Sequence, residues 1–201
     1  MITIIDYGVG NLRSVYKAFK AVGSDPLISF SKKDVLTASK IVLPGVGSFG
    51  DGMAGLRERD LEDSVRTVID QGKPFLGICV GMQLLFDRSD ELGEHAGLGI
   101  LSGKVTRFND SGLKVPQTGW NQLQVQTKSP LVYDIAPSSY VYFNHAYYCV
   151  PADPDDIILT TQYGGAYASA VGRDNLYAVQ FHPEKSQTVG LQIVRNFVER
   201  C

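Results

Sequence analysis

The most reactive group that the sequence offers is a cysteine between two glycines, in Gly77-Ile78-Cys79-Val80-Gly81. This is the G-x-nucleophile-x-G elbow with cysteine in place of serine, and it lies between an expected strand and an expected helix. The glycines permit a sharp turn, and the free N–H groups at a helix start favour a thiolate. The alternative is a buried cysteine that acts only as a small apolar side chain. In this context we interpret Cys79 as a nucleophile.

A nucleophilic thiol needs a base and a group that orients the base, and Phe181-His182-Pro183-Glu184 contains both. If the strand that begins at Leu176 continues through this segment, His182 and Glu184 point to the same face. Glu184 can then bind one ring nitrogen while the other faces the thiol, as in the Ser-His-Asp triad. Taken alone, the tripeptide favours a fortuitous strand end at the surface. Together with the Cys79 elbow it predicts a Cys-His-Glu triad.

A glycine-rich segment, Pro44-Gly45-Val46-Gly47-Ser48-Phe49-Gly50, follows the third expected strand. Its glycines let backbone N–H groups face a ligand, so Val46 and Gly47 are candidates for one side of an oxyanion hole. The second donor is the amide of Val80, directly after the nucleophile. The segment also matches G-x-G-x-x-G, but a dinucleotide site requires an acidic residue at the end of the next strand. That strand ends in Cys79, so we favour the oxyanion hole.

Composition argues against several other classes of function. The 201 residues carry 19 Lys and Arg against 21 Asp and Glu, a net charge of −2 without the basic excess typical of nucleic-acid binding. Three cysteines without a C-x-x-C pair, and three scattered histidines, argue against a disulfide framework and a zinc site. We find neither an apolar run of ~18 residues nor a signal-peptide pattern. We therefore expect a soluble cytoplasmic protein without metal or cofactor.

The elements that must position these motifs alternate along the first half of the chain. Four short apolar runs predict strands, at residues 2–5, 26–30, 41–43 and 75–78. Helical patterns separate or follow them, at residues 12–19, 56–69 and 82–86. Strands that are apolar on both faces and separated by helices predict a parallel sheet covered on both sides. Because ligands collect at the carboxyl ends of such strands, we expect the glycine-rich segment and the Cys79 elbow at one edge.

From Leu98 onward, strands joined by turns that contain Gly, Pro and Asn predict mainly antiparallel pairing. These strands are expected at residues 98–108, 123–125, 140–143, 157–163, 166–171 and 176–181. A last helix is expected from about Ser186 to Arg200. Since no linker or repeat divides the chain, we expect one α/β domain over residues 1–201. Its central sheet should be mostly parallel, with helices on both faces and a mainly antiparallel C-terminal portion.

The chain resembles the class I, or triad, glutamine amidotransferases over nearly its whole length, which implies their flavodoxin-like fold. The Cys79 elbow and His182-Pro183-Glu184 are shared by that whole family. Other segments narrow the resemblance to glutaminases that serve a separate cyclase. Together the matching segments are Asp6-Tyr7-Gly8, Gly10-Asn11-Leu12, Leu43 to Phe49, Gly77 to Leu85, Gly119-Trp120-Asn121 and Phe181 to Ser186.

The resemblance implies the reaction as well as the fold. Cys79 would attack the side-chain amide of glutamine, giving a thioester and ammonia, and water would then release glutamate. His182 would relay the protons and Glu184 would orient His182. The implied substrate contacts are Gln83 and Glu91 at the amino-acid end, with Gly47, His145, Ala146 and Tyr147 along the other side.

The resemblance also implies a heterodimer with a (β/α)8-barrel cyclase. That partner uses the ammonia to make imidazole glycerol phosphate and aminoimidazole carboxamide ribotide (AICAR) in histidine biosynthesis. Positions that match the docking surface are Asn11, Trp120, Tyr142 and Lys185. An exposed Trp120 fits the aromatic enrichment of interface cores, whereas without the resemblance a core aromatic is as good an interpretation.

One departure from the family pattern leaves the acceptor of the ammonia open. Gln117-Thr118 stands where many members carry a His and an apolar residue, in a segment expected to face the partner. A paralogous glutaminase that serves another acceptor would have the same triad. A free-standing cysteine hydrolase of γ-glutamyl or peptide bonds would also have it, but would need no Gly-Trp-Asn segment. The complete triad disfavours a binding module without activity, and Cys149, Cys201 and His95 receive no role.

Overall fold

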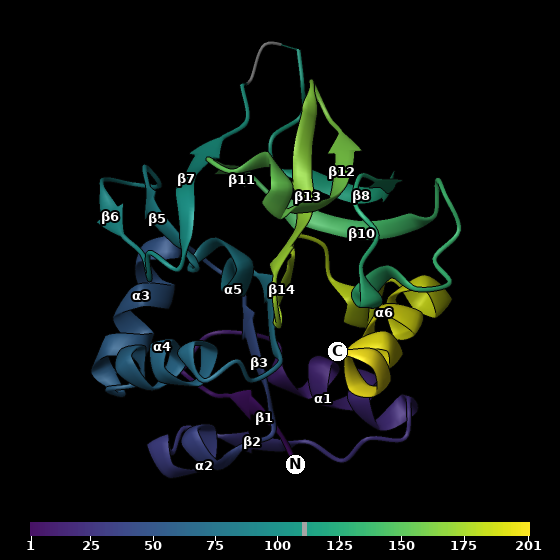
Figure 1. Ribbon diagram of the computed structural model, residues 1–201. Helices are drawn as coiled ribbons and strands as arrows, with labels where there is room; N and C mark the ends of the chain where they lie inside the picture. The colour runs from purple at the N-terminus through teal and green to yellow at the C-terminus, as the bar shows by residue number, and fades with distance from the viewer. Residues whose placement is uncertain (110–111) are drawn as a thin grey trace.

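The computed structural model describes residues 1–109 and 112–201, which form a mixed α/β fold around one eight-stranded sheet (Figure 1). Five neighbouring strands are parallel, in the order β2 (Leu27–Ser29), β1 (Ile2–Ile5), β3 (Lys40–Gly45), β4 (Phe75–Cys79) and β14 (Leu176–Val179). Three antiparallel strands extend this sheet beyond β14, namely β13 (Ala166–Arg173), β12 (Ile157–Gln162) and β9 (Gln124–Val125). The predicted fold class is therefore confirmed.

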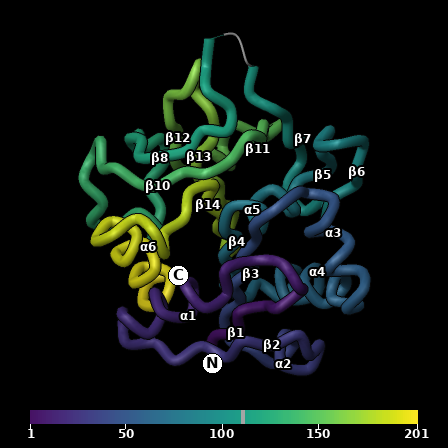
Figure 2. The backbone as a smooth tube through the Cα atoms, turned by 180° about the vertical axis from the view of Figure 1, so that it is seen from behind, coloured from purple at the N-terminus to yellow at the C-terminus, as the bar shows by residue number. Residues whose placement is uncertain are grey.

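Helices cover both faces of the parallel strands. The helices α1 (Leu12–Ala21) and α6 (Gln187–Arg200) lie side by side on one face (Figure 2), where the rings of Phe19 and Phe197 meet edge to face at 6.3 Å. The opposite face carries α2 (Lys32–Thr37), α3 (Phe49–Glu58) and α4 (Glu62–Asp70). Every residue of β1 and β4 is consequently buried. In the described part of the chain, none of the helices has the length and apolar character needed to cross a membrane.

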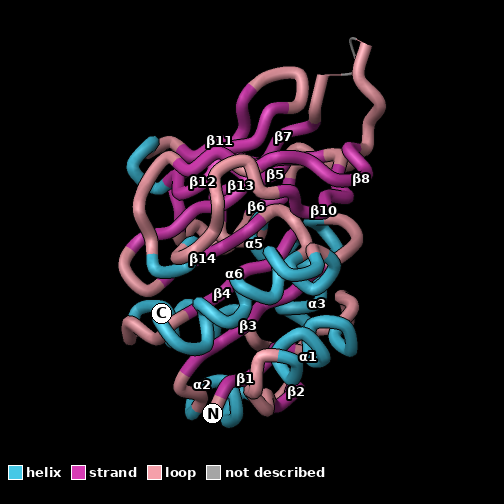
Figure 3. Tube along the Cα trace, turned by 90° about the vertical axis from the view of Figure 1, so that its right-hand side faces the viewer, coloured by secondary structure: helices cyan, strands magenta, loops and turns pink. Residues whose placement is uncertain are grey.

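Two smaller sheets lie past the carboxyl ends of the parallel strands (Figure 3). One contains, in order, β11 (Tyr147–Pro151), β7 (Leu101–Arg107), β5 (Phe86–Ser89) and β6 (His95–Ala96). The other is an antiparallel ribbon of β8 (Gln117–Gln122) and β10 (Tyr140–His145). Within residues 1–109 and 112–201, three single-turn 3-10 helices are also present, η1 (Pro130–Val132), η2 (Pro154–Asp156) and η3 (Pro183–Lys185). These additions enclose the sheet edge at which the Cys79 elbow is expected.

Several element predictions need correction. The helix expected over 56–69 is two helices, because Asp60 adopts a φ of +55° between α3 and α4. The helix expected over 82–86 is the single turn α5 (Val80–Gln83), after which Phe86 begins β5. The elements α2, β5, β6, β8 and β11 were not predicted. The segment that forms β8 is polar and mostly exposed, so it lacks the apolar alternation from which a strand is inferred.

Candidate active site

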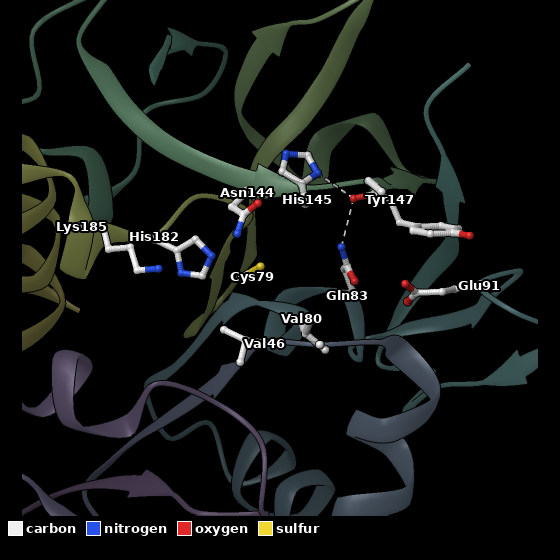
Figure 4. A pocket seen from close by; sticks show the side chains of 12 residues that line it. Val46, Cys79, Val80, Gln83, Glu91, Asn144, His145, Tyr147, His182 and Lys185 are labelled. Carbon is white, nitrogen blue, oxygen red and sulfur yellow. Dashed lines mark hydrogen bonds between the residues drawn. The ribbon is translucent and has the colours of Figure 1, made fainter. Parts of the chain in front are cut away.

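The nucleophile elbow forms at the carboxyl end of β4, as predicted. Cys79 has φ +55° and ψ −110°, a strained conformation for a residue with a side chain, and α5 begins at the next residue. The flanking glycines are needed for space. A β-carbon on Gly77 would lie 2.8 Å from the Gly81 carbonyl oxygen, and one on Gly81 would overlap the carbonyl oxygen of Leu43 in β3. The elbow thus presents the thiol to a pocket at the sheet edge (Figure 4).

His182 and Glu184 meet, but not by the geometry that the sequence suggested. The strand β14 ends at Val179, and His182 directly precedes the 3-10 turn η3, so the same-face argument for a continuous strand is wrong. The turn still brings Nδ1 of His182 to 2.9 Å from Oε1 of Glu184. Both side chains are almost fully buried, at 3% and 2% exposure. Cys79 lines the same pocket as His182 (Figure 4), and its side chain raises the pKa of the imidazole, so the three groups lie together at one site.

Two opposing effects determine the protonation of His182. Burial lowers the pKa of its ring, but the favourable interactions of the ring with Cys79 and Glu184 outweigh burial and raise that pKa to about 10. The imidazolium form is therefore favoured at neutral pH. An imidazolium held between a carboxylate and a cysteine sulfur is the charge state in which a thiolate can attack and a leaving amine can be protonated.

The turn that carries His182 is tied to the ribbon strand β10 through two residues. The His182 N–H donates to the Tyr142 carbonyl oxygen at 2.9 Å. The fully buried Ser186 hydroxyl donates to the His182 carbonyl oxygen at 2.7 Å and accepts from the Tyr142 N–H at 2.9 Å. These bonds hold the His182 backbone against β10.

The predicted oxyanion-hole and substrate-contact residues all line the same pocket as Cys79 and His182 (Figure 4). Gly47 has φ +98°, in the left-handed region that favours glycine. Asn144 and Lys185 also line the pocket, the first of them unpredicted for any role. The predicted residues that the structure brings together here are Val46, Gly47, Val80, Gln83, Glu91, His145, Ala146 and Tyr147.

Hydrogen-bond acceptors gather at one side of this pocket. The Gln83 amide nitrogen donates to the Tyr147 carbonyl oxygen at 3.1 Å and to Oε1 of Gln180 at 3.2 Å, so its oxygen is the atom left for a ligand. Glu91 accepts from the Phe49 N–H at 2.6 Å, which fixes the carboxylate at the start of α3. Burial raises the pKa of Glu91, and the Phe49 N–H opposes that shift. An amide oxygen and a carboxylate suit a ligand ammonium group.

His145 lines the pocket as a buried side chain with a neutral imidazole. Its Nδ1 lies 2.7 Å from the Tyr147 carbonyl oxygen, so Nδ1 must carry the hydrogen, and its Nε2 lies 3.4 Å from the Tyr167 hydroxyl. Burial lowers the pKa of His145 to about 4, although the bond to the Tyr147 carbonyl opposes that shift, and the charge of His182 lowers the pKa further.

The neutrality of His145 predicts an acid-sensitive fold. Unfolded chains take up a proton at this residue near its ordinary pKa of 6.5, whereas the folded protein does so near 4. The unfolded state therefore binds more protons between these values, and stability should fall as pH drops from 6.5 to 4, by about 3 kcal/mol. Denaturant unfolding at both pH values should show a shallower loss in His145→Gln. His95→Gln, at a half-buried histidine, is the control and should lose as much stability between pH 6.5 and 4 as the wild type. An equally steep loss of stability in His145→Gln would contradict the assignment of His145 as neutral in the folded protein.

The residues predicted for docking lie on a surface beside the pocket. Trp120 is 46% exposed, which excludes the alternative of a core tryptophan. Its ring lies 6.2 Å from that of Tyr142, and Nζ of Lys185 lies 5.7 Å from the centre of the Tyr142 ring. Asn11 is the exposed N-cap of α1, which packs against η3. This aromatic and basic surface runs into the pocket at Lys185.

The two residues that depart from the family pattern, Gln117 and Thr118, lie in different environments, one buried and one exposed. Gln117 is 3% exposed and accepts a hydrogen bond from the Tyr167 hydroxyl at 2.9 Å, so it lies behind the pocket wall at His145. Of the two, only Thr118 is exposed, and its hydroxyl donates a hydrogen bond to the side-chain oxygen of Asn144 at 3.1 Å. The expectation that this whole segment faces a partner is therefore wrong for Gln117.

Sequence reasoning missed two polar residues of the interior, Tyr167 and Gln180. The Gln180 side chain is fully buried, and its Nε2 lies 3.7 Å from the Cys79 sulfur. One signal was present in the sequence. A glutamine inside a strand expected to be buried on both faces must find polar partners there, and it stands two residues before the candidate base.

Comparison with known proteins agrees with this geometry. The family model described as "Glutamine amidotransferase class-I" matches residues 3–201. The chain is 50% identical over 200 residues to "Imidazole glycerol phosphate synthase subunit HisH" of Thermosynechococcus vestitus, covering 98% of this chain and 95% of that protein. It is 44% identical to the protein of the same name from Chlorobaculum tepidum, covering 99% of this chain and 100% of that protein.

Solved structures show the same fold at low identity. A glutamine amidotransferase crystal structure superposes with a TM-score of 0.77 at 21% identity, covering 99% of this chain and 98% of that chain. The structure of PurLQS from Thermotoga maritima contains a chain that superposes with a TM-score of 0.75 at 20% identity, covering 98% of this chain and 95% of that chain. The superpositions show only the fold, whereas the family match and the high identity over nearly the full length show the family. The chain belongs to the class I glutamine amidotransferases and, within them, to the HisH glutaminase subunits of imidazole glycerol phosphate synthase.

Proposed function

We propose that this chain acts as one glutaminase domain that hydrolyses L-glutamine to glutamate and ammonia through Cys79, His182 and Glu184. We further propose that the ammonia passes to a (β/α)8-barrel cyclase partner, which makes imidazole glycerol phosphate and AICAR in histidine biosynthesis. The observation that carries the proposal is the buried His182, which hydrogen-bonds to Glu184 and lines the same pocket as the elbow cysteine.

The chemistry proceeds through two acyl transfers. The Cys79 thiolate attacks the γ-carboxamide carbon, and the negative oxygen that forms is stabilised by the backbone N–H groups of Val46 or Gly47 and of Val80. His182 donates its proton to the nitrogen as the C–N bond breaks, so ammonia leaves and a γ-glutamyl thioester remains. His182 then takes a proton from water as the water attacks the thioester. The products are glutamate and the free thiol.

Selectivity for glutamine follows from the acceptors opposite the nucleophile. Both N–H groups of the Gln83 amide are engaged within the protein, so its oxygen faces the substrate, as does the Glu91 carboxylate. Two acceptors bind an α-ammonium group and would leave a buried acceptor unpaired with a substrate that lacks it. The pocket therefore binds the α-ammonium group of glutamine, while Cys79 reacts with its side-chain amide.

The partner is inferred from the names of the relatives and from the exposed surface. The relatives are named as subunits of imidazole glycerol phosphate synthase. Trp120, Tyr142 and Lys185 form a surface that an interface would cover, and Tyr142 is bonded through its backbone to the turn of His182. Binding there places the partner next to the site of ammonia release and against the element that positions the base.

The test is the dependence of glutamine hydrolysis on the partner. We expect the isolated chain to hydrolyse glutamine very slowly, and a barrel cyclase with its nucleotide ligand to accelerate it by at least about 100-fold. Glutamate release is measured with the chain alone, with the cyclase, and with the cyclase and its ligand. Trp120→Ala should reduce the acceleration, whereas Tyr133→Ala, at an exposed aromatic 54% accessible beside α6, should not. Full turnover by the chain alone would instead support a free-standing hydrolase.

A further inference from the structure

A chain of buried amides leads from the pocket wall to the nucleophile. It begins at the Tyr147 carbonyl oxygen, which accepts from Nε2 of Gln83 at 3.1 Å. The same Gln83 nitrogen donates to Oε1 of Gln180 at 3.2 Å, and Nε2 of Gln180 lies 3.7 Å from the sulfur of Cys79. Gln83 is 3% exposed and Gln180 is fully buried. The sulfur therefore has a second polar neighbour besides His182.

The direction of this hydrogen-bond chain is fixed at its first link. A backbone carbonyl oxygen can only accept, so Gln83 must present its nitrogen to Tyr147. That nitrogen also faces Gln180, which must then present its oxygen to Gln83 and its nitrogen to the sulfur. A reversed Gln180 amide would set two N–H donors against each other, with no acceptor between the two side chains. The backbone therefore specifies that an N–H donor, and not an acceptor, faces the Cys79 sulfur.

We propose that Gln180 is a further catalytic residue, which donates a hydrogen bond to the Cys79 sulfur and stabilises it as the attacking thiolate. An amide N–H cannot accept the thiol proton, so that proton has one recipient at the site, the imidazole of His182. The inference rests on the proposed role of Cys79 and assigns how its anion is stabilised before substrate arrives. A donor to an anion forms a stronger hydrogen bond than a donor to a neutral group.

The backbone of Gln180 is held firmly enough for this role. Its N–H donates to the Ser169 carbonyl oxygen at 2.9 Å, which extends the pairing of β14 with β13 past Val179. Ser169 and Gln180 are both fully buried. The amide is thus placed by strand pairing at one end and by Gln83 at the other, and packing alone would be served equally well by a methionine of similar length.

The experiment measures alkylation of the native full-length chain by iodoacetamide at pH 7, resolved by peptide mass spectrometry. Gln180→Met removes the donor and keeps the side-chain length. Gln180→Asn keeps an amide but shortens it by one methylene, so it loses contact with the sulfur and serves if the methionine variant fails to fold. We expect both to slow alkylation of Cys79 about tenfold or more. The exposed Gln124→Met in β9 should match the wild type.

A second readout separates this role from a structural one. Cys149 is buried at 1% exposure, so a loosened interior would speed its alkylation; we expect its rate and the thermal midpoint to remain near wild-type values. In the complex with the cyclase, kcat for glutamine should fall with KM within about twofold, because Gln180 is not a lining residue of the pocket. A Cys79 rate within twofold of wild type in the folded variants would overturn the role of Gln180. A wild-type Cys79 no more reactive than Cys149 would instead overturn the proposed nucleophile.

Discussion

Cys79→Ala in the complex should abolish glutamine-dependent product formation, by at least about four orders of magnitude, and leave the ammonia-dependent reaction intact. Removal of a nucleophile eliminates the covalent route and leaves only the small contribution of the remaining groups. The cyclase receives ammonia from solution in that assay, so its own chemistry does not require the thiol. Alanine keeps a β-carbon at the φ of +55°, so the elbow should retain its shape.

The two rates are measured on one preparation, with glutamine or with ammonium salt as the nitrogen source. Cys201→Ala is the matched control, because Cys201 is a partly exposed thiol at the end of α6. That variant should behave as the wild type with both sources. Glutamine-dependent turnover that survives in Cys79→Ala removes Cys79 from the mechanism, and loss of the ammonia-dependent rate points to a damaged complex.

Glu184→Gln should lower kcat for glutamine on the order of a thousandfold, with a smaller change in KM. The neutral amide no longer stabilises the imidazolium and no longer fixes the ring that must move a proton in both steps. Burial already lowers the pKa of His182, so without the carboxylate that pKa should fall well below about 10. Titration of the ring by NMR and steady-state glutaminase kinetics measure the two effects together.

The same substitution has a consequence for stability. A histidine pKa raised in the folded state stabilises the protein below the unfolded value of 6.5, and that contribution is lost as pH rises through about 10. Glu184→Gln should therefore be less stable than the wild type at pH 7, with the difference shrinking as pH rises toward 10. The exposed Glu58→Gln in α3 is the control and should show neither effect. An unchanged His182 titration together with kcat within fivefold of wild type contradicts the role of Glu184.

The part of the fold that positions Cys79 was predictable from local sequence. The strands β1 and β4 are short apolar runs because both faces are covered by helices, and the Cys79 elbow follows β4 directly. Residues that are close in sequence, such as His182 and Glu184, could also be paired. The reason given for that pairing was wrong, because Pro183 begins a 3-10 turn instead of continuing the strand.

The rest depended on contacts between distant segments. The ribbon strand β8 carries polar residues whose partners lie on β10, about 18 to 28 positions away, so its own pattern does not indicate a strand. The family resemblance led us to expect that Gln117 faces the partner with the rest of its segment, whereas in the structure it pairs with His145 and its side chain is buried. Gln180 reaches the sulfur 101 positions earlier in the chain through a bond that spacing alone cannot reveal.

The covalent intermediate is the most direct test of the mechanism. Turnover of the complex on glutamine is quenched in acid, and the peptide that contains Cys79 is examined by mass spectrometry for a γ-glutamyl adduct. The mechanism predicts an adduct on Cys79 that appears within the first turnovers, disappears when glutamine is exhausted, and is absent from Cys79→Ala. An adduct on Cys149 or Cys201 instead, or glutamate formed at the full rate with Cys79 unmodified throughout, would contradict it.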